Sequence, residues 1–179
     1  MSPLRVTGGE SRGRRLKAPR NIRPTQGIVK QAIFNIVAAQ VEGATVIDLF
    51  AGSGAIGIEA LSRGAKQVTF VDRGERGLAI LRQNLDALDV SRRARLVRAD
   101  VVRWIESSPD ELKAADLVFL DPPYGDQVFD RALLAIDRSD TGATIVAEYS
   151  RRQSLPQLDH LKLGREHRYG DTMLAVLRP

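Results

Sequence analysis

The feature that most constrains the fold is an alternation of short apolar segments with helical segments. Residues 78–88 are an example of a predicted helix, because Leu78, Leu81, Leu85 and Leu88 recur at helical spacing. Strands that alternate with helices predict a doubly wound, mostly parallel α/β sheet. Two further strand-like segments follow with no helix between them, which predicts an antiparallel hairpin at one edge. The seven predicted strands are 45–50, 67–71, 95–99, 116–120, 143–147, 161–168 and 172–177.

The beginning of the chain is strongly basic. Residues 1–30 carry eight basic side chains and one acidic one, whereas the whole chain has a net charge of +5. Residues 4–18 look like two short strands around a glycine-rich turn. A basic arm favours a polyanion partner, although a solvated, frayed terminus is the alternative. We expect a basic hairpin extension over 1–24, a single domain over 25–179, and RNA contacts from Arg5, Arg12, Arg14, Arg15, Lys17 and Arg20.

Composition excludes several kinds of site. The 179 residues contain no cysteine and two histidines, so disulfides, thiol catalysis and a multi-histidine metal site are not expected. No apolar run approaches the length of a membrane span, and residues 1–5 do not resemble the start of a signal peptide. We therefore expect a cytoplasmic monomer without a metal and without a membrane contact.

The tetrapeptide Asp121-Pro122-Pro123-Tyr124 directly follows the predicted strand 116–120. It therefore lies at the carboxyl end of a parallel strand, where open α/β sheets bind their ligands. Two prolines exclude both helix and strand pairing, so this turn is stiff. It presents one carboxylate, carbonyls without competing donors, and one aromatic ring.

Such a turn suits a flat base with an exocyclic amine. Asp121 would accept one N–H of the amine, the Pro122 carbonyl would accept the other, and Tyr124 would stack on the ring. Held in this way, a delocalised amine can attack an electrophile such as the methyl group of S-adenosylmethionine, largely through positioning and electrostatics. A plain Asp-Pro turn is the alternative interpretation.

A glycine loop follows the first predicted strand of the sheet. Gly52, Gly54 and Gly57 match the G-x-G-x-x-G spacing, and Asp72 lies twenty residues beyond Gly52. The loop allows a ligand to approach the backbone at a helix N-terminus, and Asp72 suits two ribose hydroxyls. These features alone fit both a nicotinamide and an adenosylmethionine enzyme.

Asp48 separates these two interpretations. It lies in the strand just before the glycine loop, where its carboxylate would repel a pyrophosphate and attract a cationic ligand. Asp100, after the third strand, adds an acceptor for an adenine amino group. These acidic strand ends predict a pocket for a positively charged nucleoside amino acid, although Asp48 could instead cap the backbone amides of the loop.

Six segments, in order and spread over nearly the whole chain, carry a resemblance to a known family. They are Arg23-Pro24-Thr25, Phe34-Asn35, Asp48-Leu49-Phe50-Ala51-Gly52-Ser53-Gly54, Glu59-Ala60-Leu61-Ser62-Arg63-Gly64-Ala65, Asp121-Pro122-Pro123-Tyr124 and Tyr169-Gly170-Asp171-Thr172. Together they resemble the RsmD family of bacterial 16S rRNA methyltransferases, which act on a guanine N2.

The resemblance implies a class I methyltransferase fold with S-adenosylmethionine as the methyl donor. It implies an rRNA substrate within a partly assembled 30S subunit, and the Asp121 turn as the clamp for the target base. The sequence departs from the family at Gln26-Gly27 and Lys30-Gln31, where the usual acidic residues are absent. The candidate cofactor-binding residues are Arg23, Thr25, Asp48, Phe50, Ala51, Gly52, Ser53, Gly54, Asp72, Arg73, Asp100, Val101 and Asp121.

Three other functions remain as alternatives. A DNA adenine-N6 or cytosine-N4 methyltransferase would use a similar clamp, but the chain has no separate DNA-reading domain. A nicotinamide-dependent oxidoreductase would rest on the glycine loop alone. A non-catalytic RNA-binding module would bind no cofactor.

Overall fold

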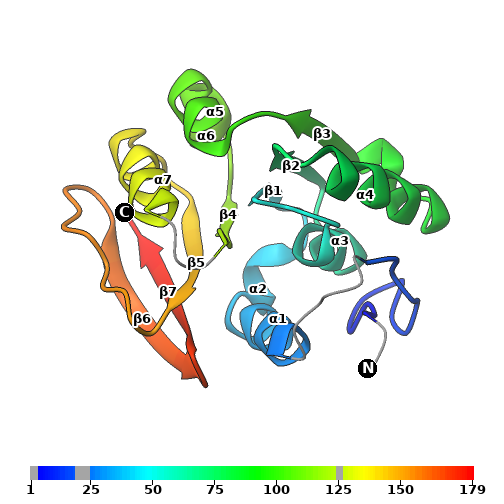
Figure 1. The fold of residues 1–179 in the computed structure, drawn as a ribbon. Helices are drawn as coiled ribbons and strands as arrows, with labels where there is room; N and C mark the ends of the chain where they lie inside the picture. The colour runs from blue at the N-terminus through cyan, green and yellow to red at the C-terminus, as the bar shows by residue number, and fades with distance from the viewer. Residues whose placement is uncertain (1–3, 19–24, 124–126) are drawn as a thin grey trace.

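The computed structural model describes residues 4–18, 25–123 and 127–179. A seven-stranded sheet forms the centre, with strand order β3-β2-β1-β4-β5-β7-β6 (Figure 1). Neighbouring strands from β3 to β5 are parallel, whereas β7 is antiparallel to both β5 and β6. The predicted doubly wound sheet and its antiparallel edge are confirmed. The strands are β1 (Thr45–Leu49), β2 (Gln67–Asp72), β3 (Ala94–Arg98), β4 (Leu117–Leu120), β5 (Thr144–Ser150), β6 (Lys162–Tyr169) and β7 (Thr172–Arg178).

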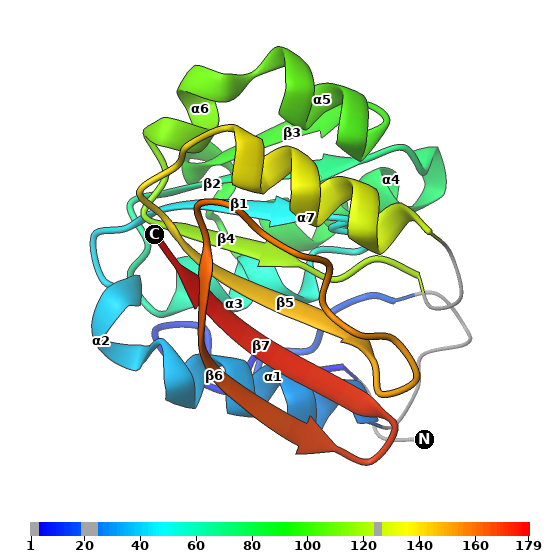
Figure 2. The ribbon, with the colours of Figure 1, turned by 90° about the vertical axis from the view of Figure 1, so that its left-hand side faces the viewer.

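Helices cover both faces of the sheet (Figures 1 and 2). Helices α1, α3 and α4 pack on one face, which we call face 1, and α5, α6 and α7 pack on the other, face 2. No helix in the described part of the chain is long and apolar enough to cross a membrane. The helices are α1 (Thr25–Ile36), α2 (Ala38–Val41), α3 (Ala55–Ser62), α4 (Glu75–Ala87), α5 (Val101–Ser107), α6 (Pro109–Lys113) and α7 (Val128–Arg138), with a 3₁₀ helix η1 (Ser91–Arg93).

Burial explains the apolar runs of the central strands. Every residue of β4 is buried, because a parallel strand with helices on both faces has no solvent side. The edge strand β6 is different, since most of its residues are exposed, including Lys162, Arg165 and Glu166. Charged side chains on an edge strand hinder pairing with another chain.

The N-terminal segment 4–18 forms a tight antiparallel loop, which we call the basic hairpin. The two predicted strands are reduced to a single bridge between Arg5 and Arg15. The turn bonds to α3 instead of extending the ladder, since the Thr7 N–H donates to Glu59 and the Ser11 N–H donates to Ser62. Val6 and Leu16 are buried in the core on face 1. The proposed boundary at residue 24 lies outside the described residues, so the division into an extension and a domain stays a prediction.

The strand order changes direction between β1 and β4. From β1 the chain proceeds outward through β2 and β3, then returns to the other side of β1 with β4. The loops that follow β1 and β4 therefore diverge, and this is the point where open α/β sheets bind ligands.

Candidate active site

The described part of the predicted clamp, residues 121–123, and the glycine loop begin side by side at this switch point. In the register of β1 and β4, Leu49 lies opposite Leu120, so the next residues, Phe50 and Asp121, begin neighbouring loops. Asp121 is half-buried, Pro122 is buried and Pro123 is exposed. Two segments that are about seventy residues apart in the sequence thus meet at one edge, which follows from the parallel topology.

The glycine loop has an unusual backbone. Phe50, Gly52 and Gly54 all have positive φ, at 61°, 54° and 84°. A Cβ added to Gly54 would lie 2.2 Å from the Leu81 side chain, so the loop packs directly on α4. Glycine is needed here both for the dihedral angle and for the close approach. The half-buried residues Ala51 and Ser53 complete the loop.

Asp72, the last residue of β2, organises the loop from the other side. Its Oδ2 accepts the Gly52 N–H at 2.8 Å and its Oδ1 accepts the Gly74 N–H at 2.6 Å. Each carboxylate oxygen has a second acceptor site. Asp72 can therefore hold the loop and still accept a ribose hydroxyl.

Asp48 is buried beneath the loop. Its side chain is 2% exposed, and its Oδ2 accepts the Gly57 N–H at 2.9 Å. The alternative that Asp48 caps a backbone amide is therefore confirmed, and it does not exclude attraction of a cation. Burial raises the pKa of Asp48 to about 7, the Gly57 hydrogen bond opposes the rise, and nearby Asp72 adds to it. A cationic ligand would favour the ionised form.

The structure says less about the remaining candidate cofactor-binding residues. Asp100 is exposed and caps α5 by accepting the Arg103 N–H at 3.1 Å, with Val101 buried behind it. Arg73 is exposed between β2 and α4. Thr25 begins α1, but its side chain, like all of Arg20, Arg23 and Tyr124, lies outside the described residues. The roles of these residues stay predictions.

Comparison with known proteins gives the family. A sequence model described as "Conserved hypothetical protein 95" matches residues 4–178. The chain belongs to this family. The resemblance to the RsmD family is confirmed, because "Ribosomal RNA small subunit methyltransferase D" of Haemophilus influenzae is 36% identical over 73% of this chain and 68% of that protein.

Two further relatives span nearly the whole chain. The "Putative rRNA methyltransferase YlbH" of Bacillus subtilis is 36% identical over 98% of both proteins. The solved structure "Putative methyltransferase yhhF from Escherichia coli" is 27% identical and covers 99% of this chain and 98% of that one, with a TM-score of 0.86. The class I methyltransferase fold implied by the resemblance is thereby confirmed.

In the present protein, hydrogen bonds hold the end of the basic hairpin next to the glycine loop. The buried side chain of Asn84 accepts the Lys17 N–H at 2.8 Å and donates to the Lys17 carbonyl at 2.9 Å and to the Ser53 carbonyl at 3.2 Å. One amide thus joins the end of the hairpin, α4 and the loop. The described basic residues of the hairpin are all exposed: Arg5, Arg12, Arg14, Arg15 and Lys17.

A buried charge cluster beneath the hairpin was not predicted. Glu59 is fully buried and pairs with Lys30 at 2.9 Å and with Arg63 at 2.9 Å. Lys30 also donates to the Arg5 carbonyl at 2.6 Å. Lys30, one of the positions at which the sequence departs from the family, therefore helps to hold the hairpin against α1 and α3. The position of Lys30 on the apolar face of α1 was the signal, since it lies three residues before Ile33 and four before Phe34.

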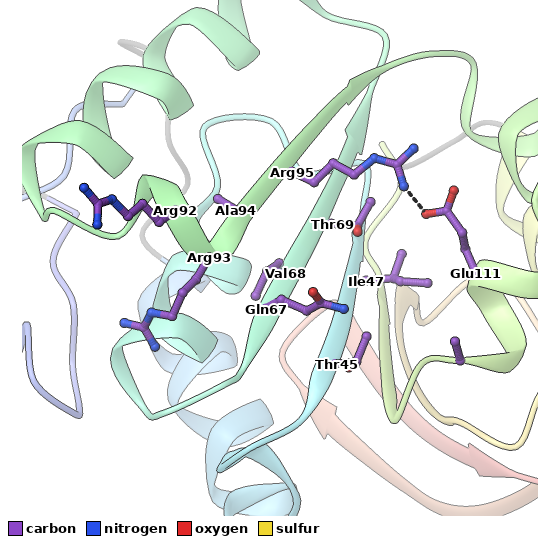
Figure 3. A pocket seen from close by; sticks show the side chains of 11 residues that line it. Thr45, Ile47, Gln67, Val68, Thr69, Arg92, Arg93, Ala94, Arg95 and Glu111 are labelled. Carbon is purple, nitrogen blue, oxygen red and sulfur yellow. Dashed lines mark hydrogen bonds and ion pairs between the residues drawn. The ribbon is translucent and has the colours of Figure 1, made fainter.

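One cavity lies at the opposite edge of the sheet. It has a volume of about 320 Å³ and opens at the amino ends of β1, β2 and β3, where Thr45, Gln67 and Thr69 line it (Figure 3). Arg95 and Glu111 pair across it at 2.6 Å. Because ligands of parallel sheets bind at the carboxyl ends of the strands, this cavity is separate from the candidate active site.

Proposed function

We propose that the protein transfers a methyl group from S-adenosylmethionine to the exocyclic N2 of a guanine in 16S rRNA, within a 30S subunit that is still being assembled. The observation that carries this proposal is the meeting of the Asp121 turn with the glycine loop at the switch point of the sheet. Relatives named rRNA small subunit methyltransferases support the choice of substrate.

The backbone and the carboxylates of the pocket suit S-adenosylmethionine as the methyl donor. S-adenosylmethionine supplies an electrophilic methyl group on a sulfonium. Gly52 leaves the backbone accessible, and the Asp72 carboxylate attracts a cation, which would in turn favour the ionised form of Asp48. A nicotinamide dinucleotide would bring its pyrophosphate to the same carboxylates, so the geometry favours the methyl donor.

Individual residues then have distinct tasks. Asp72 accepts the ribose hydroxyls and Asp100 accepts the adenine amine. Arg23 and Thr25 receive the methionine carboxylate. The backbone around Phe50 and Ala51 forms the floor, and Arg73 and Val101 border the adenine.

Asp121 and the Pro122 carbonyl hold the guanine amine. Proline has no N–H, so the Pro122 carbonyl has no competing donor on its own residue, and the buried ring fixes its direction. Two acceptors on one amine orient its lone pair away from the plane of the base, and the proton lost after transfer needs no strong base. Tyr124 stacks on the base, which must leave its own stack to reach it.

The basic hairpin holds the rRNA. Its exposed cations release counterions when they meet phosphates, and Asn84 keeps its end beside the glycine loop. Short basic motifs do not encode a nucleotide sequence, so the shape of the partly assembled particle selects the target.

The test compares Asp121→Ala with Asp110→Ala, a change at an exposed acidic residue of α6. Transfer of labelled methyl is measured on naked 16S rRNA, assembled 30S particles, assembly intermediates and DNA. Donor binding is measured by calorimetry, and the product nucleoside is identified by mass spectrometry. We expect Asp121→Ala to lose roughly 100-fold or more of its turnover while donor binding is retained. Near-normal turnover, or a product other than N2-methylguanosine, would disprove the proposal.

A further inference from the structure

Three acidic residues lie on, or directly after, neighbouring strands near the carboxyl edge of the sheet. Asp48 of β1 lies opposite Phe119 of β4, and Phe119 lies opposite Val146 of β5. Glu148 follows Val146 by two residues on β5, and Asp121 follows Phe119 by two residues, directly after the end of β4. Both therefore lie one residue past Leu120 and Ala147, the last β4–β5 pair.

The side chain of Glu148 points to face 1, which also carries Asp48. Along β5 the residues alternate, since Val146 belongs to the core on face 1 whereas Ala147 and Tyr149 belong to the core on face 2. Glu148 pairs with Leu174 of β7, which is fully buried in the core on face 1. Paired residues on neighbouring strands point to the same face.

The backbone at Glu148 is held in place by its pairing with β7 and by the packing of the next residue. Pairing with β7 continues from Ile145 to Ser150, beyond the end of β4. The next residue, Tyr149, is buried, stacks on Phe129 with ring centroids 5.1 Å apart, and donates a hydrogen bond to Glu166. A carboxylate on such a strand is positioned more accurately than one on a loop.

A carboxylate beside an amine clamp distinguishes guanine from the other amine-bearing bases. One of the two ring nitrogens next to the guanine amine, N1, carries a hydrogen, whereas the other, N3, does not. The ring nitrogen next to the amine is an unprotonated acceptor in adenine and in cytosine. An ionised carboxylate has acceptors only, so it attracts N1–H of guanine and repels the lone pair of the other two.

We propose that Glu148 selects guanine as the target base by accepting its N1–H, while Asp121 and the Pro122 carbonyl hold N2. This inference rests on the proposed function and adds the residue that determines base specificity. It also explains how a clamp of this type rejects adenine and cytosine. The structural feature behind it is the register, which brings the chain at Glu148 next to the start of the Asp121 turn and directs Glu148 to face 1.

The test uses 2-aminopurine, which keeps the 2-amino group but has an unprotonated N1. Small-subunit particles are reconstituted with rRNA that carries guanine or 2-aminopurine at the target position, and kcat/KM is measured for wild type and Glu148→Gln. The glutamine amide can donate to N1 of 2-aminopurine. We expect the variant to lose about tenfold or more on guanine and to gain on 2-aminopurine relative to guanine by at least the same factor.

The ratio of the two substrates separates specificity from folding. A structural defect lowers both rates together, and the missing O6 of 2-aminopurine affects wild type and variant alike. Glu106→Gln, at an exposed position of α5, is the matched control and should leave the ratio unchanged. A ratio in Glu148→Gln equal to that of wild type disproves the inference alone. Failure of the wild type to methylate the guanine particles disproves the proposed function as well.

Discussion

Lys30 of α1 and Glu59 of α3 form an ion pair of 2.9 Å in which both side chains are almost fully buried, at 3% and 0% exposure. Burial alone would raise the pKa of Glu59, but the hydrogen bonds from Lys30 and Thr7 outweigh it, so this pKa lies below its usual value. The pair connects two helices on face 1 to the basic hairpin through Thr7 and the Arg5 carbonyl.

Replacement of Lys30 by methionine should destabilise the protein strongly. It leaves the Glu59 carboxylate buried without its main partner, and breaking a buried pair on one side costs roughly 3–5 kcal/mol. Urea denaturation followed by circular dichroism measures the loss. The exposed pair Arg95–Glu111 is the control, since it is even shorter than the Lys30–Glu59 pair, at 2.6 Å, but Arg95 is 60% exposed. Arg95→Met should change stability by about 1 kcal/mol or less, and equal losses in the two variants would contradict this account.

Replacement of two glycines by alanine should change the stability of the protein in opposite directions. A Cβ on Gly57 would lie 2.2 Å from the ring of Phe70, which is fully buried, so Gly57→Ala should cost about 1–3 kcal/mol through overpacking. Gly27 lies in α1 with nothing within 4 Å of the added Cβ. Gly27→Ala should therefore stabilise the protein by about 0.5–1 kcal/mol. Thermal unfolding of both variants checks the signs, and a destabilised Gly27→Ala would show that this position has a further role.

The central strands could be predicted from the sequence because helices cover both of their faces. Such strands contain continuous apolar runs, and the predicted segment 116–120 differs from β4 (Leu117–Leu120) by one residue. The strand β5 was predicted to end at residue 147, but it continues to Ser150. Glu148 interrupts the apolar run, and only the pairing with β7 keeps the chain extended there. A local sequence pattern does not reveal this distant pairing, so the sequence analysis did not single out Glu148.

The sequence predicted the residues of the candidate site that lie at strand ends, but it did not predict the residues that hold the site in place. Parallel topology makes the ends of β1, β2 and β4 meet, so Asp48, Asp72 and Asp121 could be grouped from their positions alone. The link from Lys17 through Asn84 to Ser53 joins residues far apart in sequence. Its polar groups have no periodicity that could identify them, and the same holds for the partner of Lys30.

Asp48 should make the stability of the protein depend on pH. Burial raises the pKa of Asp48 from 3.8 to about 7, so between these values the folded state keeps a proton that the unfolded state releases. Stability therefore falls as pH rises through this window, on the order of 4 kcal/mol in total from this group. Asp48→Asn keeps an acceptor for the Gly57 N–H and cannot ionise. We expect the stability of the variant relative to wild type to rise from pH 4 to pH 7 in denaturation curves. A constant difference would mean that Asp48 titrates normally.

Charge reversal on the hairpin should weaken binding to the RNA substrate without unfolding the protein. Arg12 and Arg15 are exposed, and each phosphate contact that is lost should reduce the slope of log affinity against log salt by roughly one. We expect Arg12→Glu with Arg15→Glu to weaken binding at low salt and to lower this slope by about two, while thermal stability stays close to that of wild type.

The matched control is Arg103→Glu with Arg131→Glu, because both residues are exposed on α5 and α7, which cover face 2. Binding assays over a salt series check both double variants. Equal slopes for the two would mean that the protein responds to its overall charge, and that the hairpin has no special place in holding RNA.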